Sequence, residues 1–144
     1  MAFDSKFIDR FKRIVLPRVS SFEIAALSSV QGMMLQRIHN DGKASDNSLL
    51  GDYSAQYAKF RKLHGRQTGK KDLELFGGLR RSVKLGVSGK NNVLGFDNDN
   101  ARLIAGYQEG QVKKKIYTLS DQEDKERVEA YTRELNFHLR KVRR

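Results

Sequence analysis

The sequence contains no cysteine and a single proline, Pro17, in 144 residues. Without cysteine the chain can form no disulfide framework, no thiolate zinc site and no cysteine nucleophile. No segment approaches the roughly 18 consecutive apolar residues that span a bilayer. The first ten residues contain charged side chains before the apolar stretch of a signal peptide could form. We therefore expect a protein that is neither exported by such a signal nor held in a membrane.

Positive charge dominates the composition. The chain has 28 Lys and Arg against 17 Asp and Glu, a formal net charge of +11, and a pI of about 10.0. Its length is typical of one domain, and a 38% apolar content can form a modest core, so we expect a single domain over residues 1–144. The charge excess indicates a polyanion, an acidic protein partner or strongly charged surroundings.

Helical periodicity predicts that residues 1–40 are helical. Apolar residues recur at spacings of three and four over residues 3–16, and Pro17 should end this first helix. Ser20 and Glu23 form a capping-box pattern that should open a second helix, reaching His39. The expected apolar stripe of this second helix is Ile24, Leu27, Val30, Met34 and Ile38.

A long helix is expected over residues 120–144. Ser120 and Glu123 repeat the capping-box pattern at its start. The apolar residues that follow at helical spacing predict one packed face, made of Val128, Tyr131, Leu135, Leu139 and Val142.

The region between the terminal helices, residues 41–119, begins with irregular structure. Residues 40–52 are rich in Asn, Asp, Ser and Gly and should form a loop. Residues 53–63 carry apolar residues at helical spacing and predict a short, weak helix, whose Tyr53, Tyr57 and Phe60 are more typical of a core than of a base-stacking platform. Gly65 to Lys71 is polar and basic, which suggests an exposed flexible connection.

The second half of this region alternates between strand and helix patterns. Two runs around a turn at residues 89–92 predict a β-hairpin. Residues 101–107 should form a helix ending at Gly110, and residues 112–119 a third strand. Helices around a small antiparallel sheet define an α+β fold.

Motifs for catalysis and ligand binding are incomplete. Asp97 begins a stretch like a calcium loop, but Arg102 and Gln108 stand where that loop requires Gly and Glu. Gly65 to Lys71 resembles a phosphate-binding loop but has one residue too few between its glycines, and no Ser or Thr follows Lys70.

The histidines form no metal-binding pattern either, because they lie in three different expected elements without a His-x-x-x-His pair. We expect all three histidines, which are His39, His64 and His138, to be solvated or capping residues. We therefore predict no catalytic residue, no metal and no cofactor, and a protein that is not an enzyme.

Basic residues are concentrated in three stretches. Ten Lys and Arg residues lie between Lys59 and Lys90 against two acidic residues, a lysine run lies at residues 113–115, and four basic residues lie at positions 140–144. A solvated surface and a contact with a polyanion both explain this, but no base-reading motif is present. The candidates to face a partner or DNA are Arg61, Lys62, Arg66, Lys70, Lys71, Arg80, Arg81, Lys113, Lys114, Lys115, Arg140 and Lys141.

Three stretches resemble, in the same order, motifs of the virion morphogenesis family of tailed bacteriophages, small tail-completion and neck proteins. Residues 76–83 resemble Thr-Gly-x-Leu-Arg-x-Ser-Ile, with Phe in place of Thr. Residues 94–96 and 104–110 resemble a Val-Gly motif and Ile-Ala-x-His-Gln-x-Gly, with Tyr107 in place of His. Residues 119–123 are similar to the Leu-Ser-Asp-x-Asp/Glu of the last helix. The matching residues are Gly77, Leu79, Ser82, Gly95, Ala105, Gln108, Gly110 and Ser120.

The resemblance implies a non-enzymatic structural protein of the virion, made in the bacterial host cytoplasm. Such a protein would assemble with copies of itself into a ring, in the neck, at the head-tail joint or at the tail end. Its partners would be other neck, portal or tail proteins and, through nonspecific phosphate contacts, packaged DNA. The alternative is a sequence-nonspecific basic nucleic-acid-binding protein, whose affinity would fall steeply with salt.

Overall fold

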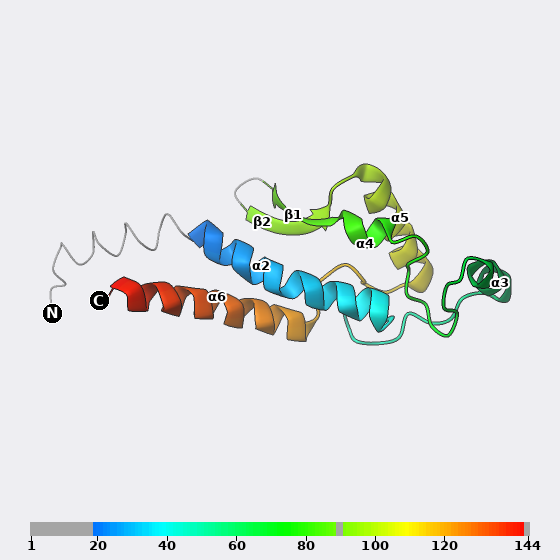
Figure 1. Cartoon of the computed structure of the whole chain (residues 1–144), viewed down its shortest axis with the longest axis horizontal. Helices are drawn as coiled ribbons and strands as arrows, with labels where there is room; N and C mark the ends of the chain where they lie inside the picture. The colour runs from blue at the N-terminus through cyan, green and yellow to red at the C-terminus, as the bar shows by residue number, and fades with distance from the viewer. Residues whose placement is uncertain (1–18, 89–90, 143–144) are drawn as a thin grey trace.

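The computed structural model describes residues 19–88 and 91–142 (Figure 1). The regular elements in these residues are helices and one two-stranded antiparallel sheet, which confirms the predicted α+β fold with a long C-terminal helix. The helix expected over residues 3–16, its end at Pro17, and Arg143 and Arg144 lie outside the described residues. The elements are α2 (Val19–Leu35), the π-helical turn η2 (Gln36–Asn40), α3 (Ala55–Leu63), α4 (Gly78–Ser82), β1 (Val83–Ser88), β2 (Asn91–Phe96), α5 (Asp99–Val112) and α6 (Asp121–Val142).

Helix α2 buries a stripe of apolar side chains four residues apart, a spacing that keeps them on one helix face. The stripe consists of Phe22, Ala26, Val30 and Met34, and Ile38 in η2 continues it. The expected stripe is therefore wrong at its start, because Ile24 is 44% exposed. The expected N-cap is also wrong, since α2 already includes Val19 and Ser20. Glu23 instead accepts a hydrogen bond from Nδ2 of Asn92 in β2, at 2.8 Å.

The capping box at the start of α6 is confirmed. The backbone N–H of Ser120 donates to Oε2 of Glu123 at 2.8 Å, and the N–H of Glu123 donates to Oγ of Ser120 at 3.3 Å. Helix α6 then runs antiparallel to α2 along its length (Figure 1). Phe22 packs edge-on against Tyr131, with ring centroids 5.9 Å apart. Val128, expected on the packed face, is 51% exposed.

A buried ion pair ties η2 to the start of α6. Nε of Arg37 lies 2.7 Å from Oε1 of Glu123, and both side chains are almost inaccessible to solvent. Arg37 also donates to the carbonyls of Lys43, Ile116 and Thr118. One guanidinium group therefore holds together α6, the loop after η2 and the segment before α6.

The predicted β-hairpin is present, with Val83 opposite Phe96 and Ser88 opposite Asn91. Its turn was predicted too long, because Asn91 and Asn92 belong to β2. The hairpin lies beside α2 (Figure 1), where Nε2 of Gln31 donates to the carbonyl of Val83 at 2.9 Å.

The third strand expected over residues 112–119 is wrong. Helix α5 starts at the N-cap Asn98, passes the predicted end at Gly110 and continues to Val112, after which the chain is irregular up to α6. Oε1 of Glu109 accepts hydrogen bonds from the backbone N–H groups of Ile116 and Tyr117, at 2.7 and 3.1 Å. Side chains thus satisfy backbone groups that a neighbouring strand would otherwise pair.

The apolar core lies where α2, η2, the loop after η2 and the hairpin meet. Its buried members are Met34, Ile38, Ala44, Leu50, Val83 and Ile116. The loop predicted over residues 40–52 is irregular except for Asn40, which belongs to η2, and it has one isolated bridge between Lys43 and Leu49. Burying these side chains holds the loop and the segment before α6 on the α2/α6 pair.

Helix α3, predicted as a weak helix, lies at one extreme of the molecule (Figure 1). Oγ of its N-cap Ser54 accepts a hydrogen bond from the N–H of Tyr57 at 3.3 Å. No described helix or strand packs along α3 as α6 packs along α2. We call residues 54–71, which comprise α3 and the basic connection after it, the α3 arm.

Candidate functional site

Solvent exposure divides the candidate basic residues into three groups. Seven are exposed: Lys62, Lys70, Arg81, Lys113, Lys115, Arg140 and Lys141. Four are half-buried: Arg66, Lys71, Arg80 and Lys114. Arg61 is only 1% exposed, so the expectation that it faces a partner or DNA is wrong.

Arg61 fixes the α3 arm to the following segment. Its Nη2 lies 2.8 Å from Oδ1 of Asp72, and its Nε and Nη1 donate to the carbonyls of Gln67 and Glu74 at 3.0 and 2.9 Å. The guanidinium also lies over the ring of Tyr53, 4.2 Å from its centroid. A short helix with few packing contacts is thus held by a polar network around one cation.

Asp72 is the anionic centre of this network. Its carboxylate accepts from the Tyr53 hydroxyl at 2.9 Å, from the N–H of Glu74 at 3.0 Å, and from Nε2 of Gln67. Burial works to raise the pKa of Asp72, but these hydrogen bonds and the Arg61 charge outweigh it and lower the pKa below its usual value. Burial and the Asp72 carboxylate raise the pKa of Tyr53 to about 12. Asp72 therefore carries its charge at neutral pH, opposite Arg61.

Glu74 collects two further candidate arginines. Nη2 of Arg66 lies 3.7 Å from one carboxylate oxygen of Glu74, and Nη1 of Arg80 lies 3.5 Å from the other. Nη1 of Arg80 also donates to Oδ1 of Asn40 at 3.2 Å. Asp72 and Glu74, the two acidic residues within the basic stretch 59–90, thus hold three of its arginines in place. Sequence reasoning counted these two acids against the charge of the stretch but assigned them no role.

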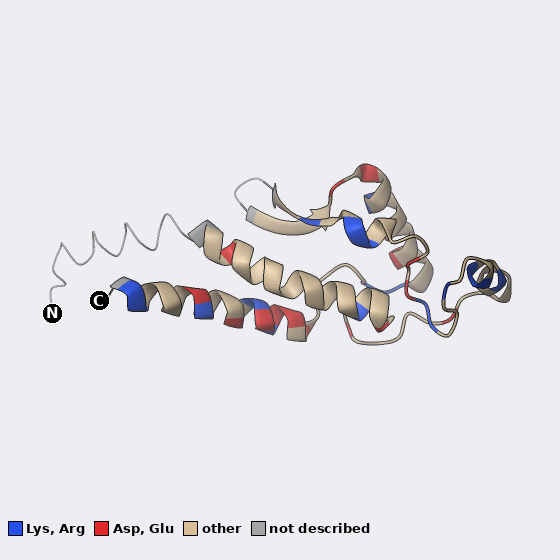
Figure 2. Ribbon diagram, in the orientation of Figure 1, with Lys and Arg blue, Asp and Glu red and all other residues tan. Residues whose placement is uncertain are grey.

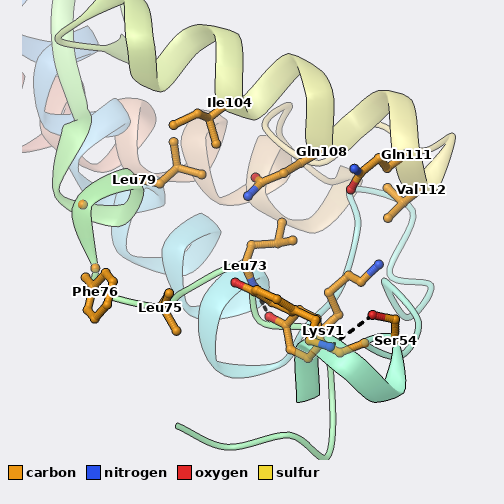
Figure 3. Close-up of a pocket in the computed structure, with 14 residues that line it drawn as sticks. Ser54, Lys71, Leu73, Leu75, Phe76, Leu79, Ile104, Gln108, Gln111 and Val112 are labelled. Carbon is orange, nitrogen blue, oxygen red and sulfur yellow. Dashed lines mark hydrogen bonds between the residues drawn. The ribbon is translucent and has the colours of Figure 1, made fainter. Parts of the chain in front are cut away.

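A groove of about 680 Å³ lies between α3, residues 71–79 and α5 (Figure 3). Its walls are mainly apolar, and its polar groups belong to Ser54, Lys71, Gln108, Gln111 and the tyrosines Tyr53 and Tyr57. Leu79 from α4 and Ile104 from α5 face each other at one end (Figure 3). Such a mix suits an apolar side chain or segment with a few polar anchors.

Gln108, one of the two amides at the groove, is held by the half-buried Tyr117. The hydroxyl of Tyr117 donates to Oε1 of Gln108 at 2.7 Å. Burial, followed by the charge of Glu109, raises the pKa of Tyr117 well above its usual value, so Tyr117 stays protonated and a donor. Gln108 is thereby oriented with its amide NH2 available as a donor toward the groove.

Aromatic rings form a continuous row along the α3 arm. The centroid separations are 5.2 Å from Tyr53 to Tyr57, 5.8 Å to Phe60, 4.3 Å on to His64 and 5.7 Å on to Phe76. The expectation that these aromatics belong to the core is wrong for Tyr57 and Phe60, which are 38% and 42% exposed. Apolar side chains gathered on a surface mark an interaction site.

The apolar exposure continues beyond the aromatic row. Phe76 is 69% exposed, and Leu63, at the end of α3, is 85% exposed. The other large face of this kind belongs to α5, where Leu103 and Tyr107 are 61% and 72% exposed.

The residues that carry the family resemblance fall on α4, β2, α5 and the start of α6. Gly77 caps α4 at φ +74°, a conformation that favours glycine, and Oγ of buried Ser82 donates to the Leu79 carbonyl at 2.8 Å. Gly95 lies in β2 opposite Lys84. The remaining members are Leu79, Gln108, Gly110, buried Ala105 and the capping residue Ser120.

The histidines differ from one another in burial. His39 is 4% exposed, so the expectation of a solvated residue is wrong for it. Its Nδ1 lies 2.9 Å from the Asp72 carbonyl and its Nε2 has no hydrogen-bond partner among the described residues. His64 is exposed, with Nδ1 2.9 Å from the Phe60 carbonyl, and His138 packs on Phe22. No group of three His, Asp or Glu in the described part of the chain could hold a metal ion.

The two other basic stretches lie apart from the α3 arm. Nζ of Lys114 donates to the Leu49 carbonyl at 2.6 Å, and Nζ of Lys115 lies 3.8 Å from Glu109. At the end of α6, Lys141 lies over the ring of Phe137, 4.3 Å from its centroid. The structure therefore joins Arg61, Arg66 and Arg80 through Asp72 and Glu74, and the candidates of the other two stretches lie outside this cluster.

No family model matches the chain, and no curated protein or solved structure shows significant similarity to it. None of the helices in the described ranges is both long enough and apolar enough to cross a membrane.

Proposed function

We propose that the chain is a structural subunit of a tailed-bacteriophage virion that forms a homo-oligomeric ring in the neck or tail-completion complex. The observation that carries the proposal is the apolar surface. Eleven large apolar residues of the described chain are exposed, among them Phe60 and Leu63 on the arm and Leu103 and Tyr107 on α5. Exposure on this scale is expected of a subunit whose partners are missing.

The positions of the motif residues support the same proposal. Gly77 and Leu79 line the groove together with Ile104 and Gln108, although the two stretches are separated by more than twenty residues in the sequence. Residues of two resembling stretches thus share one surface feature, as expected if they act together in assembly.

Assembly in solution tests the proposal directly. The purified full chain should form closed rings of one size, visible by negative-stain electron microscopy and with a matching mass in native mass spectrometry. In a producing phage, antibodies to the chain should label particles at the neck or tail end. A monomer that binds neither portal nor tail proteins and does not occur in particles would overturn the proposal.

A second candidate is a sequence-nonspecific nucleic-acid-binding protein, favoured by the exposed side chains of Lys59, Lys62 and Lys70 on the arm. Binding of duplex DNA would then weaken with a slope of about −0.9 in log K against log salt per phosphate contact. DNA binding by a monomer, without ring formation, would favour this candidate over the first.

A further inference from the structure

We infer that the α3 arm of one copy docks on the first half of α6 of a neighbouring copy, residues 121–134. This inference rests on the proposed ring. The occupant is a second copy of this chain because the two surfaces are complementary in charge and in apolar character.

The arm offers a basic face with an apolar edge. Lys59, Lys62 and Leu63 lie at spacings of three and four on α3, so they share one side of the helix, and all three are exposed. Arg61, the other basic residue of α3, is buried by Asp72 and cannot contribute. The positive charge of the face therefore comes from Lys59 and Lys62, and Leu63, the last residue of α3, lies beside Lys59 at one edge of the face.

The first half of α6 offers the opposite arrangement. Asp121, Asp124 and Glu129 are exposed, and Val128 beside them is 51% exposed. Lys125 and Arg133 are the exposed basic residues of the same stretch, and Arg127 pairs with Asp124 at 2.8 Å. Acidic groups still prevail, because residues 121–134 contain six Asp and Glu against three Lys and Arg. Figure 2 shows acidic residues with some basic residues between them on this half of α6, and basic residues on α3. An apolar residue among mainly acidic neighbours on one helix matches an apolar residue beside two lysines on the other.

The two surfaces meet only between copies. In Figure 1, α3 lies at one extreme of the molecule, beyond the end of the α2/α6 pair, so a chain does not place its own arm on its own α6. A contact between two different surfaces of identical chains is head-to-tail, and such contacts close into rings when the rotation allows it. DNA would engage the lysines alone and leave Leu63 and Phe60 without an apolar partner, which is why a protein surface is favoured.

Cross-linking between single-cysteine variants tests the contact in the otherwise cysteine-free chain. Lys62→Cys and Glu129→Cys should form a disulfide-linked heterodimer when mixed under mild oxidation, and neither should link to itself. The matched control pairs Lys62→Cys with Lys141→Cys, at the opposite end of α6, and should give no heterodimer. Equal yields in the two mixtures would overturn the inference.

Charge reversal gives an independent readout. Lys59→Glu with Lys62→Glu, and separately Asp124→Lys with Glu129→Lys, should each raise the concentration needed for ring assembly by about tenfold or more, because like charges then face each other. Combining all four changes in one chain should restore assembly. The control, Lys84→Glu with Arg102→Glu, alters exposed residues of β1 and α5 by the same total charge and should leave assembly unchanged. Circular dichroism confirms that each variant folds.

The outcomes separate this inference from the proposed function. Rings that persist in both charge-reversed variants overturn the docking inference and leave the proposed function intact. A monomeric wild-type chain overturns the proposed function and the inference together. Loss of duplex DNA binding without loss of assembly in the arm variant assigns the arm to DNA and overturns the inference.

Discussion

The α2/α6 pair and the α3 arm are both helical, yet different forces hold them. Helix α2 buries a stripe of apolar side chains against α6 and the hairpin, whereas the one fully buried side chain of α3 is Arg61. Apolar burial spreads stability over many residues, while a polar network concentrates it in a few bonds. The arm should therefore unfold separately, at a lower free energy than the pair.

The two buried arginine–carboxylate pairs make this comparison sharper. The partners Arg37 and Glu123 are 86 residues apart in the sequence, whereas Arg61 and Asp72 are 11 apart. The first pair closes the tertiary structure, and the second closes a local loop. Similar chemistry should thus produce a global effect in one place and a local effect in the other.

The largest effect is expected from Glu123→Ala. This change leaves Arg37 buried without its carboxylate and also removes half of the capping box, so the free energy of unfolding should fall by about 3–5 kcal/mol. Urea denaturation followed by circular dichroism measures it. Asp124→Ala, an exposed acidic neighbour, is the control and should cost less than about 1 kcal/mol. Equal losses in the two variants would contradict a global role for the buried pair.

Arg61→Met should act on the arm alone. The change removes the bonds to Asp72 and to the carbonyls of Gln67 and Glu74, so amide exchange in α3 should accelerate by about 100-fold or more. Exchange in α2 and α6 should stay as in the wild type. Hydrogen exchange with mass spectrometry resolves the regions, with exposed Lys62→Met as the control. Faster exchange throughout the chain would show that the arm and the pair unfold together.

Acidification should weaken the joint between the two regions, because His39 in η2 contacts the Asp72 carbonyl next to the arm. Burial lowers the pKa of His39 below 6.5, and the nearby Arg80 charge adds to this, while the Asp72 carbonyl and the Glu74 and Asp72 carboxylates partly oppose it. The unfolded chain therefore binds a proton first, and stability should fall as the pH drops below about 6.5, by at most about 1.4 kcal/mol per pH unit.

The measurement is the free energy of unfolding at pH 7.5 and 5.5. His39→Gln should lose less stability between the two pH values than the wild type does. His64→Gln, at an exposed histidine, is the matched control and should keep the wild-type pH dependence. If His39→Gln kept it as well, His39 would not be the responsible group.

The smallest effects are expected from removing one helix N-cap in each of the two regions. Ser120→Ala and Ser54→Ala each remove a helix N-cap, worth about 1 kcal/mol. The first should lower the global free energy of unfolding, since α6 belongs to the pair. The second should change only amide exchange within α3. A global loss from Ser54→Ala equal to that from Ser120→Ala would remove the distinction between arm and pair.

Local signals made parts of this fold predictable. The Ser120 and Glu123 capping box, the hairpin and the extent of α2 and η2 to Asn40 depend on residues close in sequence, and these predictions are confirmed apart from the ends. The false third strand has a distant cause, because Glu109 and Arg37 bind the backbone groups of residues 116–118. Hydrogen bonds from distant side chains to such backbone groups leave no periodic pattern in the sequence.

For the site, the main failure of sequence reasoning was in predicting which charged side chains are buried. Counting basic residues finds the stretch 59–90 but does not distinguish exposed Lys62 from buried Arg61 one position before it. That distinction depends on Asp72, which the fold of the chain places beside Arg61. The family resemblance stays a prediction, since the fold is compatible with many functions.

The anchoring of the arm through Arg61 has a geometric consequence for any ring joined through it. The angle between successive copies would depend on the direction of α3 relative to α2 and α6, and the bonds of Arg61 to residues 67, 72 and 74 help to set that direction. Copy number follows from this angle. A substitution at Arg61 could thus alter the number of subunits that close the circle, without touching either docking surface.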